Sequence, residues 1–404
     1  MPYTNIYSAT KPLYYVSSLF GLAPVSWCSG KKHGFIRDRV RILKLFWTVL
    51  LTLTLFPSMY YNISLSVPKS NNVTRIIGFA IFHVPLYLSC IITLFVGLTV
   101  NRSKLPQLLY KIMQVDRVLI ITSTRLCMYR KTKVHIFLQL LVVFVIVVAL
   151  WLFDMSSYCG LHCYHAYLGI VPFLVNTVEI IQFLNFVMIL RTKYKLLNAY
   201  LTSLLPALKI NENTVPSSNF HTTFINFVPN EVLEVKSSCS SSLLNDMTQS
   251  EVKIHHLREI YSRLYDISLI ISSIYGISLL GVIVWLFTYS IACIVFALQH
   301  FSNGRIPIAN ILLLLLSQCL LAAIAVPCHV TTDEASRSSV LIQKLLLRRD
   351  INKRFISHLD RFYTQINSMT IKFTACGFFS LDMSLFCGII GAICTYVFVI
   401  TQLK

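Results

Sequence analysis

Charged residues are scarce in this sequence. They make up 13% of its 404 residues, whereas soluble domains average about 25%. Hydrophobic residues make up 55%, and the mean hydropathy is +0.68. This balance excludes an ordinary soluble protein and predicts a chain that crosses a membrane several times.

Alternating apolar and polar positions are also lacking, which excludes a transmembrane β-barrel. Seven continuous apolar runs are present instead, each as long as the roughly 20 residues that a helix needs to cross a bilayer. Because backbone groups in lipid must be hydrogen-bonded within their own segment, we expect an all-α, polytopic membrane protein with seven transmembrane helices. The runs are 43–65, 76–100, 134–153, 164–190, 267–298, 306–330 and 373–403.

Acidic residues are less than half as numerous as basic ones, 16 against 35, which gives a net charge of +19. The basic residues lie beside the predicted spans, so they report membrane topology and not a nucleic-acid partner. If the N-terminus is cytosolic, the basic residues left outside are Lys69, Arg75, Arg305 and Lys404. The positive-inside rule therefore favours a cytosolic N-terminus and, with seven spans, an extracellular C-terminus.

Asparagine sequons agree with this orientation. Asn62-Ile-Ser and Asn72-Val-Thr fall in the first predicted outer loop, which makes Asn62 and Asn72 candidate glycosylation sites. Asn101-Arg-Ser would be cytosolic and unused.

Catalytic and metal-binding signatures are lacking as well. Neither a phosphate loop, a two-histidine zinc motif nor a G-x-S-x-G elbow is present. The crowded stretch YCGLHCYH at 158–165 matches no standard zinc spacing, so a Cys159–Cys163 disulfide or plain loop packing is favoured there over a metal site. We therefore predict no enzyme, no metal and no cofactor.

Composition divides the chain into four parts. A cytosolic N-terminal segment (1–42), which includes an interfacial or cytosolic helix, precedes spans one to six (43–330). A flexible Ser- and Asn-rich cytosolic loop (206–250) interrupts those spans. An amphipathic basic segment (331–372) precedes the last span (373–404), and helices projecting below the membrane either pack there into an anchor bundle or lie along the lipid surface.

Polar residues inside the predicted spans indicate a ligand site. Ionisable groups at bilayer depth are costly and point to function, or else they hydrogen-bond a neighbouring helix. The outer halves of spans two to six are aromatic and mildly polar, which suits a small organic ligand, although an interfacial aromatic belt explains about half of the pattern equally well. The candidate ligand-binding residues are His83, Trp151, Asp154, Tyr164, Glu179, Trp285, Tyr289 and Gln318.

The last span carries a predicted break and a polar stripe. Gly377 can end one helix and Ser380 can cap the next, with Asp382 in its first turn. Small and polar residues then recur on one helical face, where they either let helices approach closely or line water. They are Ser384, Gly388, Gly391, Thr395, Val399 and Gln402.

The C-terminal stretch FTACGFFSLDMSLFCGIIGAICTYVFVITQL resembles the signature of the insect gustatory receptors. In that signature a Gly-aromatic segment and an Asp precede Thr-Tyr, five apolar residues and Gln-Phe. The matching residues are Gly377, Phe378, Asp382, Thr395, Tyr396 and Gln402, whereas Leu403 replaces the usual Phe.

The resemblance implies a tastant-gated, non-selective cation channel in the plasma membrane, assembled as a homo- or hetero-tetramer with related receptors. The last helix of each subunit would line the pore, and the ligand would be a sugar or a bitter compound. Asp382 and Tyr396 would support this helix, and Leu403 is apolar enough to gate by dewetting. The implied pore and gate residues are Gly388, Gly391, Thr395, Val399, Gln402 and Leu403.

Two other classes of protein compete with this reading. A seven-helix receptor coupled to G proteins needs an extracellular N-terminus, which the charge distribution opposes. A secondary transporter predicts midplane coupling groups and paired broken helices, whereas this sequence has one isolated acid and one break.

The predicted topology can be tested with epitope tags. We expect a tag placed after Lys404 to be stained in intact cells, and an N-terminal tag to be stained only after permeabilisation. Staining of the N-terminal tag alone in intact cells would contradict the charge argument and would favour a G-protein-coupled receptor.

Overall fold

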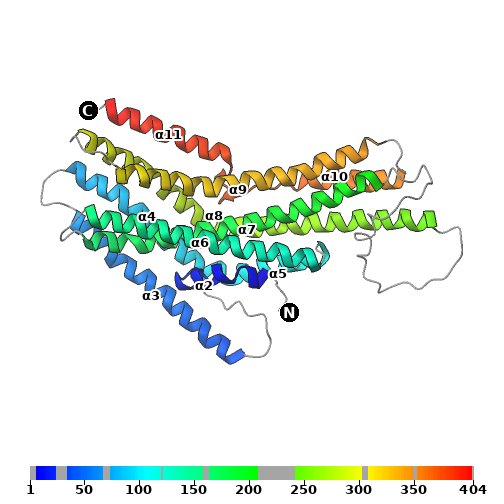
Figure 1. The fold of residues 1–404 in the computed structure, drawn as a ribbon, viewed down its shortest axis with the longest axis horizontal. Coiled ribbons are helices and arrows are strands. Elements are labelled where there is room, and N and C mark those ends of the chain that lie inside the picture. The colour runs from blue at the N-terminus through cyan, green and yellow to red at the C-terminus, as the bar shows by residue number, and fades with distance from the viewer. Residues whose placement is uncertain are drawn as a thin grey trace.

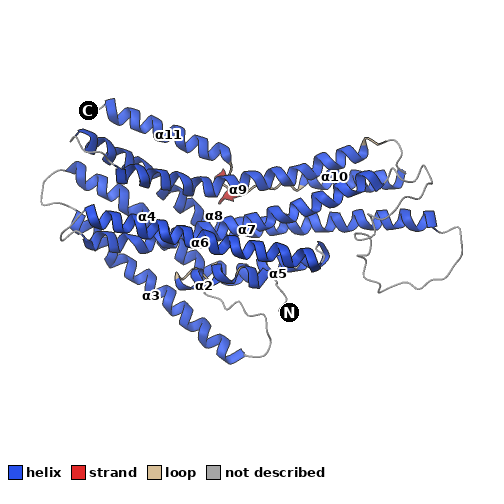
Figure 2. Cartoon of the chain, viewed as in Figure 1, coloured by secondary structure: helices blue, strands red, loops and turns tan. Residues whose placement is uncertain are grey.

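The computed structural model describes residues 6–23, 34–66, 73–119, 122–157, 163–207, 242–302, 308–348 and 353–402. These residues are helical apart from short connections and one small hairpin, which confirms the all-α prediction (Figures 1 and 2). The elements are α1 (Ile6–Ala9), α2 (Lys11–Leu19), α3 (Gly34–Ser66), α4 (Val73–Thr99), α5 (Asn101–Leu119), α6 (Thr122–Ser157), α7 (Cys163–Ala207), α8 (Ser242–Ser302), α9 (Ile308–Leu346), α10 (Lys353–Ser368), β1 (Thr374–Ala375), β2 (Phe379–Ser380) and α11 (Met383–Gln402).

The long apolar helices correspond to the predicted runs. Among the described residues, five helices are long and apolar enough to cross a membrane, and a sixth candidate is α4 together with α5, which are bent by 67° at their junction. The helix α11 adds a shorter apolar segment, Met383–Val399. The chain is therefore a polytopic membrane protein.

Three helices extend well beyond the length that a bilayer requires. The helices α7, α8 and α9 contain 45, 61 and 39 residues, so α8 is about 90 Å long. Their extensions pack together with α10 at the end of the molecule that holds Ala207 and Ser242, here called the loop end (Figure 1). The apolar side of α10 is buried against this bundle, at Phe355, Leu359, Phe362 and Ile366.

Some details of the helices differ from the sequence predictions. The helix α8 begins at Ser242, inside the expected loop 206–250. The helix α9 continues unbroken past residue 330, in keeping with the expected helical extensions below the membrane, and the position of the domain boundary along it stays a prediction. The helix α5 was not predicted, although its buried residues recur at helical spacing: Leu105, Leu108, Leu109, Ile112 and Val115.

The break in the last span is a β-hairpin and not the end of a helix. Thr374 pairs with Ser380 and Ala375 with Phe379. Gly377 lies in the turn with φ +79°, next to Cys376 with φ +53°. The left-handed backbone of a turn favours glycine, which explains why the same residue reads as a helix end in the sequence.

The helix α2 packs against the membrane-spanning bundle. Gln182 of α7 donates from Nε2 to Ser17 Oγ at 3.2 Å, and Trp47 of α3 donates from Nε1 to the Leu19 carbonyl at 2.8 Å. Leu13 of α2 is buried with Ile136 of α6. The N-terminal helix is thus held by segments far along the chain.

A buried ion pair joins α5, α6 and α7 towards the loop end. Lys193 pairs with Asp116, and the two side chains are 1% and 5% exposed. Tyr129 donates a hydrogen bond to Asp116 Oδ2, and Lys193 donates to the Tyr129 hydroxyl at 3.3 Å. Because each charge is desolvated, each depends on its partner for compensation.

We expect Lys193→Met to lower stability by about 3–5 kcal/mol, because it leaves the Asp116 carboxylate buried without a countercharge. The double substitution Lys193→Met with Asp116→Leu should recover most of that loss, since it removes both charges. Thermal unfolding of the purified protein in detergent measures both effects, with Lys195→Met at an exposed position of α7 as the control. A double variant less stable than Lys193→Met would contradict this account.

Candidate functional site

The antiparallel packing of α7 and α8 positions the candidate ligand site. Side chains from the two helices meet at successive levels along the bundle, in edge-to-face ring pairs and one hydrogen bond. The pairs are Phe173 with Trp285, Glu179 with Ser278, Phe183 with Tyr275, and Tyr194 with Tyr261. This register fixes which α8 residues face the core.

Trp285 lies at the centre of the aromatic part of the site. It is fully buried, and its ring lies 5.4 Å from that of Phe173 at an interplanar angle of 90°. Tyr289, one turn further along α8, is also buried, with its ring 6.0 Å from Trp285. The Trp285 Nε1–H has no hydrogen-bond partner among the described residues. An unsatisfied buried donor costs about 1–3 kcal/mol, so a ligand that accepts its hydrogen bond would remove that cost.

Gln318 of α9 supplies a buried acceptor in the same region. Its Nε2 donates to Ser290 Oγ of α8 at 2.9 Å, and Ser290 is hydrogen-bonded to Ser317 at 2.9 Å. Its Oε1 has no partner among the described residues. Ser290 lies about 7.5 Å beyond Trp285 along the helix axis. The region therefore offers a small molecule both a donor and an acceptor.

Glu179 is fully buried and accepts a hydrogen bond from Ser278 Oγ at 2.7 Å through Oε1. Its Oε2 has no hydrogen-bond partner among the described residues. The carboxyl group thus ties α7 to α8, as the alternative of a bond to a neighbouring helix anticipated. It also keeps one oxygen available.

His83 and Glu179 lie at different depths. Asn176 of α7 donates to Ser89 Oγ at 2.7 Å and to the Leu86 carbonyl at 3.3 Å, which aligns α4 with α7. Glu179 follows Asn176 in the chain, whereas His83 precedes Leu86, and the two helices run in the same direction. The rise of a helix then separates them by about 9–14 Å along the bundle.

The remaining predicted ligand residues cannot be placed by side chain. Trp151 and Asp154 belong to α6 and Tyr164 to α7, but their side chains lie outside the described residues. Asn72 and Leu403 are also outside the described residues, as is the stretch 158–162. Asn62 falls near the end of α3 and not in a loop.

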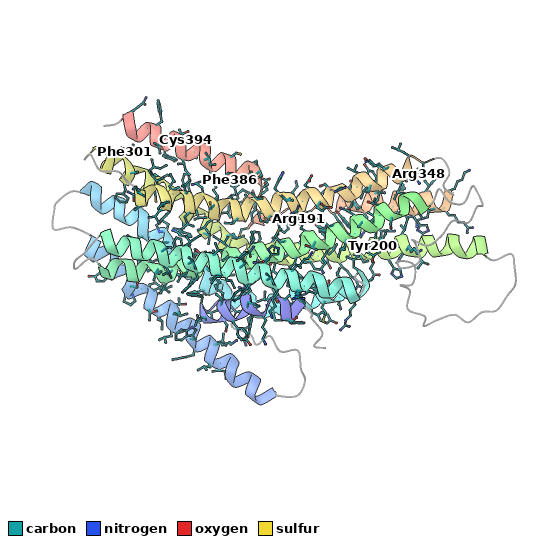
Figure 3. All side chains as sticks on the ribbon, viewed as in Figure 1. Arg191, Tyr200, Phe301, Arg348, Phe386 and Cys394 are labelled. Carbon is teal, nitrogen blue, oxygen red and sulfur yellow. The ribbon has the colours of Figure 1, made fainter. Side chains whose placement is uncertain are left out.

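The polar stripe of α11 faces away from the rest of the chain. Ile393, half a helical turn from it, is buried, whereas every residue of the stripe is exposed. A Cβ atom added at Gly388 or Gly391 would meet nothing within 4 Å. In Figure 3 α11 lies at the edge of the bundle, with Phe386 and Cys394 labelled on it. In a single chain, no other segment that the structure describes covers this face of α11.

Two contacts hold the ends of α11. Near its C-terminus, Tyr396 makes an edge-to-face ring contact with Phe287 of α8, with centroids 6.0 Å apart. At its start, Asp382 Oδ1 accepts hydrogen bonds from the backbone N–H of Ser384 at 3.0 Å and of Leu385 at 3.1 Å. Asp382 is therefore the helix cap, the role that the sequence assigned to Ser380.

Ser380 has a different role from the predicted one. Its hydroxyl donates to Asp382 Oδ2 at 2.7 Å, which links β2 to the start of α11. Ser278, Phe173 and Phe287 are site residues that the sequence did not indicate, because each acquires its role from a contact with a distant helix.

Among the described residues, no group of three His, Cys, Asp or Glu side chains could hold a metal ion. The buried polar groups at Trp285, Glu179 and Gln318 lie on three helices. They suit the recognition of a small molecule in a largely apolar setting.

Comparison with known proteins identifies the family. Residues 10–404 match the family described as 7tm Chemosensory receptor. Over 85 residues, 21% of this chain, the sequence is 32% identical to gustatory and pheromone receptor 32a of Drosophila melanogaster, and the match spans 18% of that relative's length.

Solved structures show the same fold. The insect olfactory receptor OR5 from Machilis hrabei matches with a TM-score of 0.67 at 12% identity, over 98% of this chain and 97% of that one. OR5 in complex with eugenol matches with a TM-score of 0.59, at the same identity and coverage. Neither the family nor the fold is that of an enzyme, and the resemblance to insect chemosensory receptors is confirmed. Since the family match covers nearly the whole sequence, the chain belongs to the 7tm chemosensory receptor family.

Proposed function

We propose that the protein is a gustatory receptor that acts as a tastant-gated, non-selective cation channel of four subunits in the plasma membrane. The uncovered stripe of α11 carries this proposal. Four copies arranged around an axis would turn these small and polar faces towards a shared water-filled path. The pore would be lined by Gly388, Gly391, Thr395 and Val399 and would narrow at Gln402 and Leu403.

The buried aromatic region is the proposed tastant site. Trp285 and Tyr289 offer ring faces, the Trp285 Nε1–H offers a donor, and Gln318 Oε1 offers an acceptor. Aromatic stacking with hydrogen-bonding groups suits a sugar and suits a bitter compound. The binding of the small molecule eugenol by OR5, a protein of the same fold, supports a small organic ligand here.

The proposed orientation has the loop end in the cytosol and Gln402 at the extracellular face. The basic residues of the sequence support it through the positive-inside rule. A ligand that binds more tightly when α8 has moved would shift the population towards that arrangement, and α11 would follow.

We expect Trp285→Phe to raise the half-maximal agonist concentration about 3- to 10-fold, because it removes the N–H donor and keeps most of the ring. Trp285→Ala should have a larger effect. Patch-clamp recording with a tastant panel measures the shift, and surface biotinylation controls for expression. Val284→Ala is the matched control, since the neighbouring Val284 is half exposed. Unchanged dose–response curves for both Trp285 variants would remove this residue from the binding site.

The subunit number has a direct test. We expect the purified receptor to have about four times the 46.1 kDa mass of the chain in mass photometry, after correction for detergent. A stable monomer or dimer under conditions that preserve agonist-gated currents would contradict a four-subunit pore.

A further inference from the structure

The β1–β2 hairpin is seated between α7 and α8. Phe373, Ala375 and Leu381 are buried, and the Phe373 ring lies 6.4 Å from that of Phe183 of α7, edge to face. The Leu381 N–H donates to the Phe373 carbonyl at 2.8 Å, which closes the base of the hairpin. The base of the hairpin is thus anchored in the bundle, whereas its tip, residues 376–378, is exposed.

Because Gly276 has no side chain, the backbone of α8 lies directly against the backbone of the hairpin. A Cβ atom at Gly276 would lie 3.1 Å from the Cys376 nitrogen and 3.4 Å from the Thr374 carbonyl oxygen. Both are backbone atoms, so neither can rotate away as the end of a side chain can. Any larger residue would therefore push α8 and β1 apart.

Gly281 on the same helix provides a contrast. A Cβ atom there would have its nearest neighbours at 3.4–3.5 Å, in Ser89 and Ile92 of α4. This is ordinary van der Waals contact. It involves a different helix, so substitution at Gly281 tests the general effect of alanine on α8 without disturbing the hairpin.

The hairpin and α11 are joined by hydrogen bonds to Asp382. Asp382 accepts hydrogen bonds from Ser380 of β2 through one oxygen and from Ser384 and Leu385 of α11 through the other. A displacement of β1 is therefore carried into the start of α11. Ionic acceptors make stronger hydrogen bonds than neutral ones, which stiffens the joint.

The helix α8 also carries the proposed tastant site. Trp285 lies nine residues beyond Gly276, about 13 Å along the same helix. Between them Ser278 is bonded to Glu179, which holds α8 against α7 close to the hairpin. Movement at Trp285 thus reaches the hairpin through one continuous helix.

We infer that the contact between Gly276 and β1 passes movement of α8 to α11, which makes Gly276 a positioning residue of the gate. This inference rests on the proposed channel function. We assign the arrangement seen in the structure to the closed channel. It requires close contact at Gly276, so a substitution that opens this contact disfavours the closed arrangement and shifts the population towards the open one.

The test compares Gly276→Ala with Gly281→Ala in the full-length receptor. We expect Gly276→Ala to raise agonist-independent current about tenfold and to lower the half-maximal agonist concentration, with Gly281→Ala close to wild type. Hydrogen–deuterium exchange of residues 383–402 is measured in parallel, and faster exchange is expected in Gly276→Ala alone.

Hydrogen–deuterium exchange of α11 distinguishes a failure of this inference from a failure of the proposed channel function. If the wild-type protein carries no agonist-gated current, the proposed function fails, while exchange in α11 still decides whether the contact controls that helix. If Gly276→Ala does not reach the cell surface, Phe373→Leu replaces it, because the smaller side chain loosens the hairpin from Phe183. Currents and exchange equal to those of Gly281→Ala would overturn the inference.

Discussion

The arrangement of the bundle depends on a series of buried polar side chains along α7. Lipid gives helices no hydrophobic reason to associate, so packing and hydrogen bonds must specify their neighbours. Each polar residue of this series bonds a different partner: Asn176 reaches α4, Glu179 reaches α8, Gln182 reaches α2, Asn185 reaches Gln139 of α6, Lys193 reaches α5 and α6, and Asn198 reaches Glu334 of α9. The helix α7 is therefore bonded to six other helices and sets their register.

The helix α11 is held in the opposite way. Among the described contacts it has no buried polar bond to a neighbouring helix. It is attached through the Asp382 junction, the ring contact of Tyr396 with Phe287, and apolar packing of residues that include Leu385, Phe386 and Ile389. Buried polar bonds therefore specify the packing around α7, whereas α11 depends on apolar contacts and on its junction with the hairpin. This difference suits a protein in which α11 changes position more readily than the helices bonded to α7.

The sequence predicts the membrane-spanning helices better than it predicts the contacts that build the candidate ligand site. Apolar runs located the long apolar helices, because the bilayer requires about 20 apolar residues whatever the tertiary contacts; the less apolar α5 was missed. The hairpin was missed since its strands have two residues each and lie within an apolar stretch. Glu179 was recognisable as a costly buried acid, but its partner Ser278 is 99 residues away and has no local signature. Lys193 looked like one more basic residue beside a span, because its pairing with Asp116 depends on the bend between α4 and α5.

The packing of α2 has a consequence for biogenesis. Ser17 leaves the ribosome early, but Gln182, its partner in α7, follows 165 residues later. The helix α2 can therefore complete its contacts only after several spans have entered the bilayer and α6 and α7 are in place. During that interval its apolar residue Leu13, which is buried with Ile136 and Ile181 in the finished protein, is uncovered. Docking of α2 thus reports that the spans up to α7 have been inserted, whereas α8 to α11 follow later in the chain.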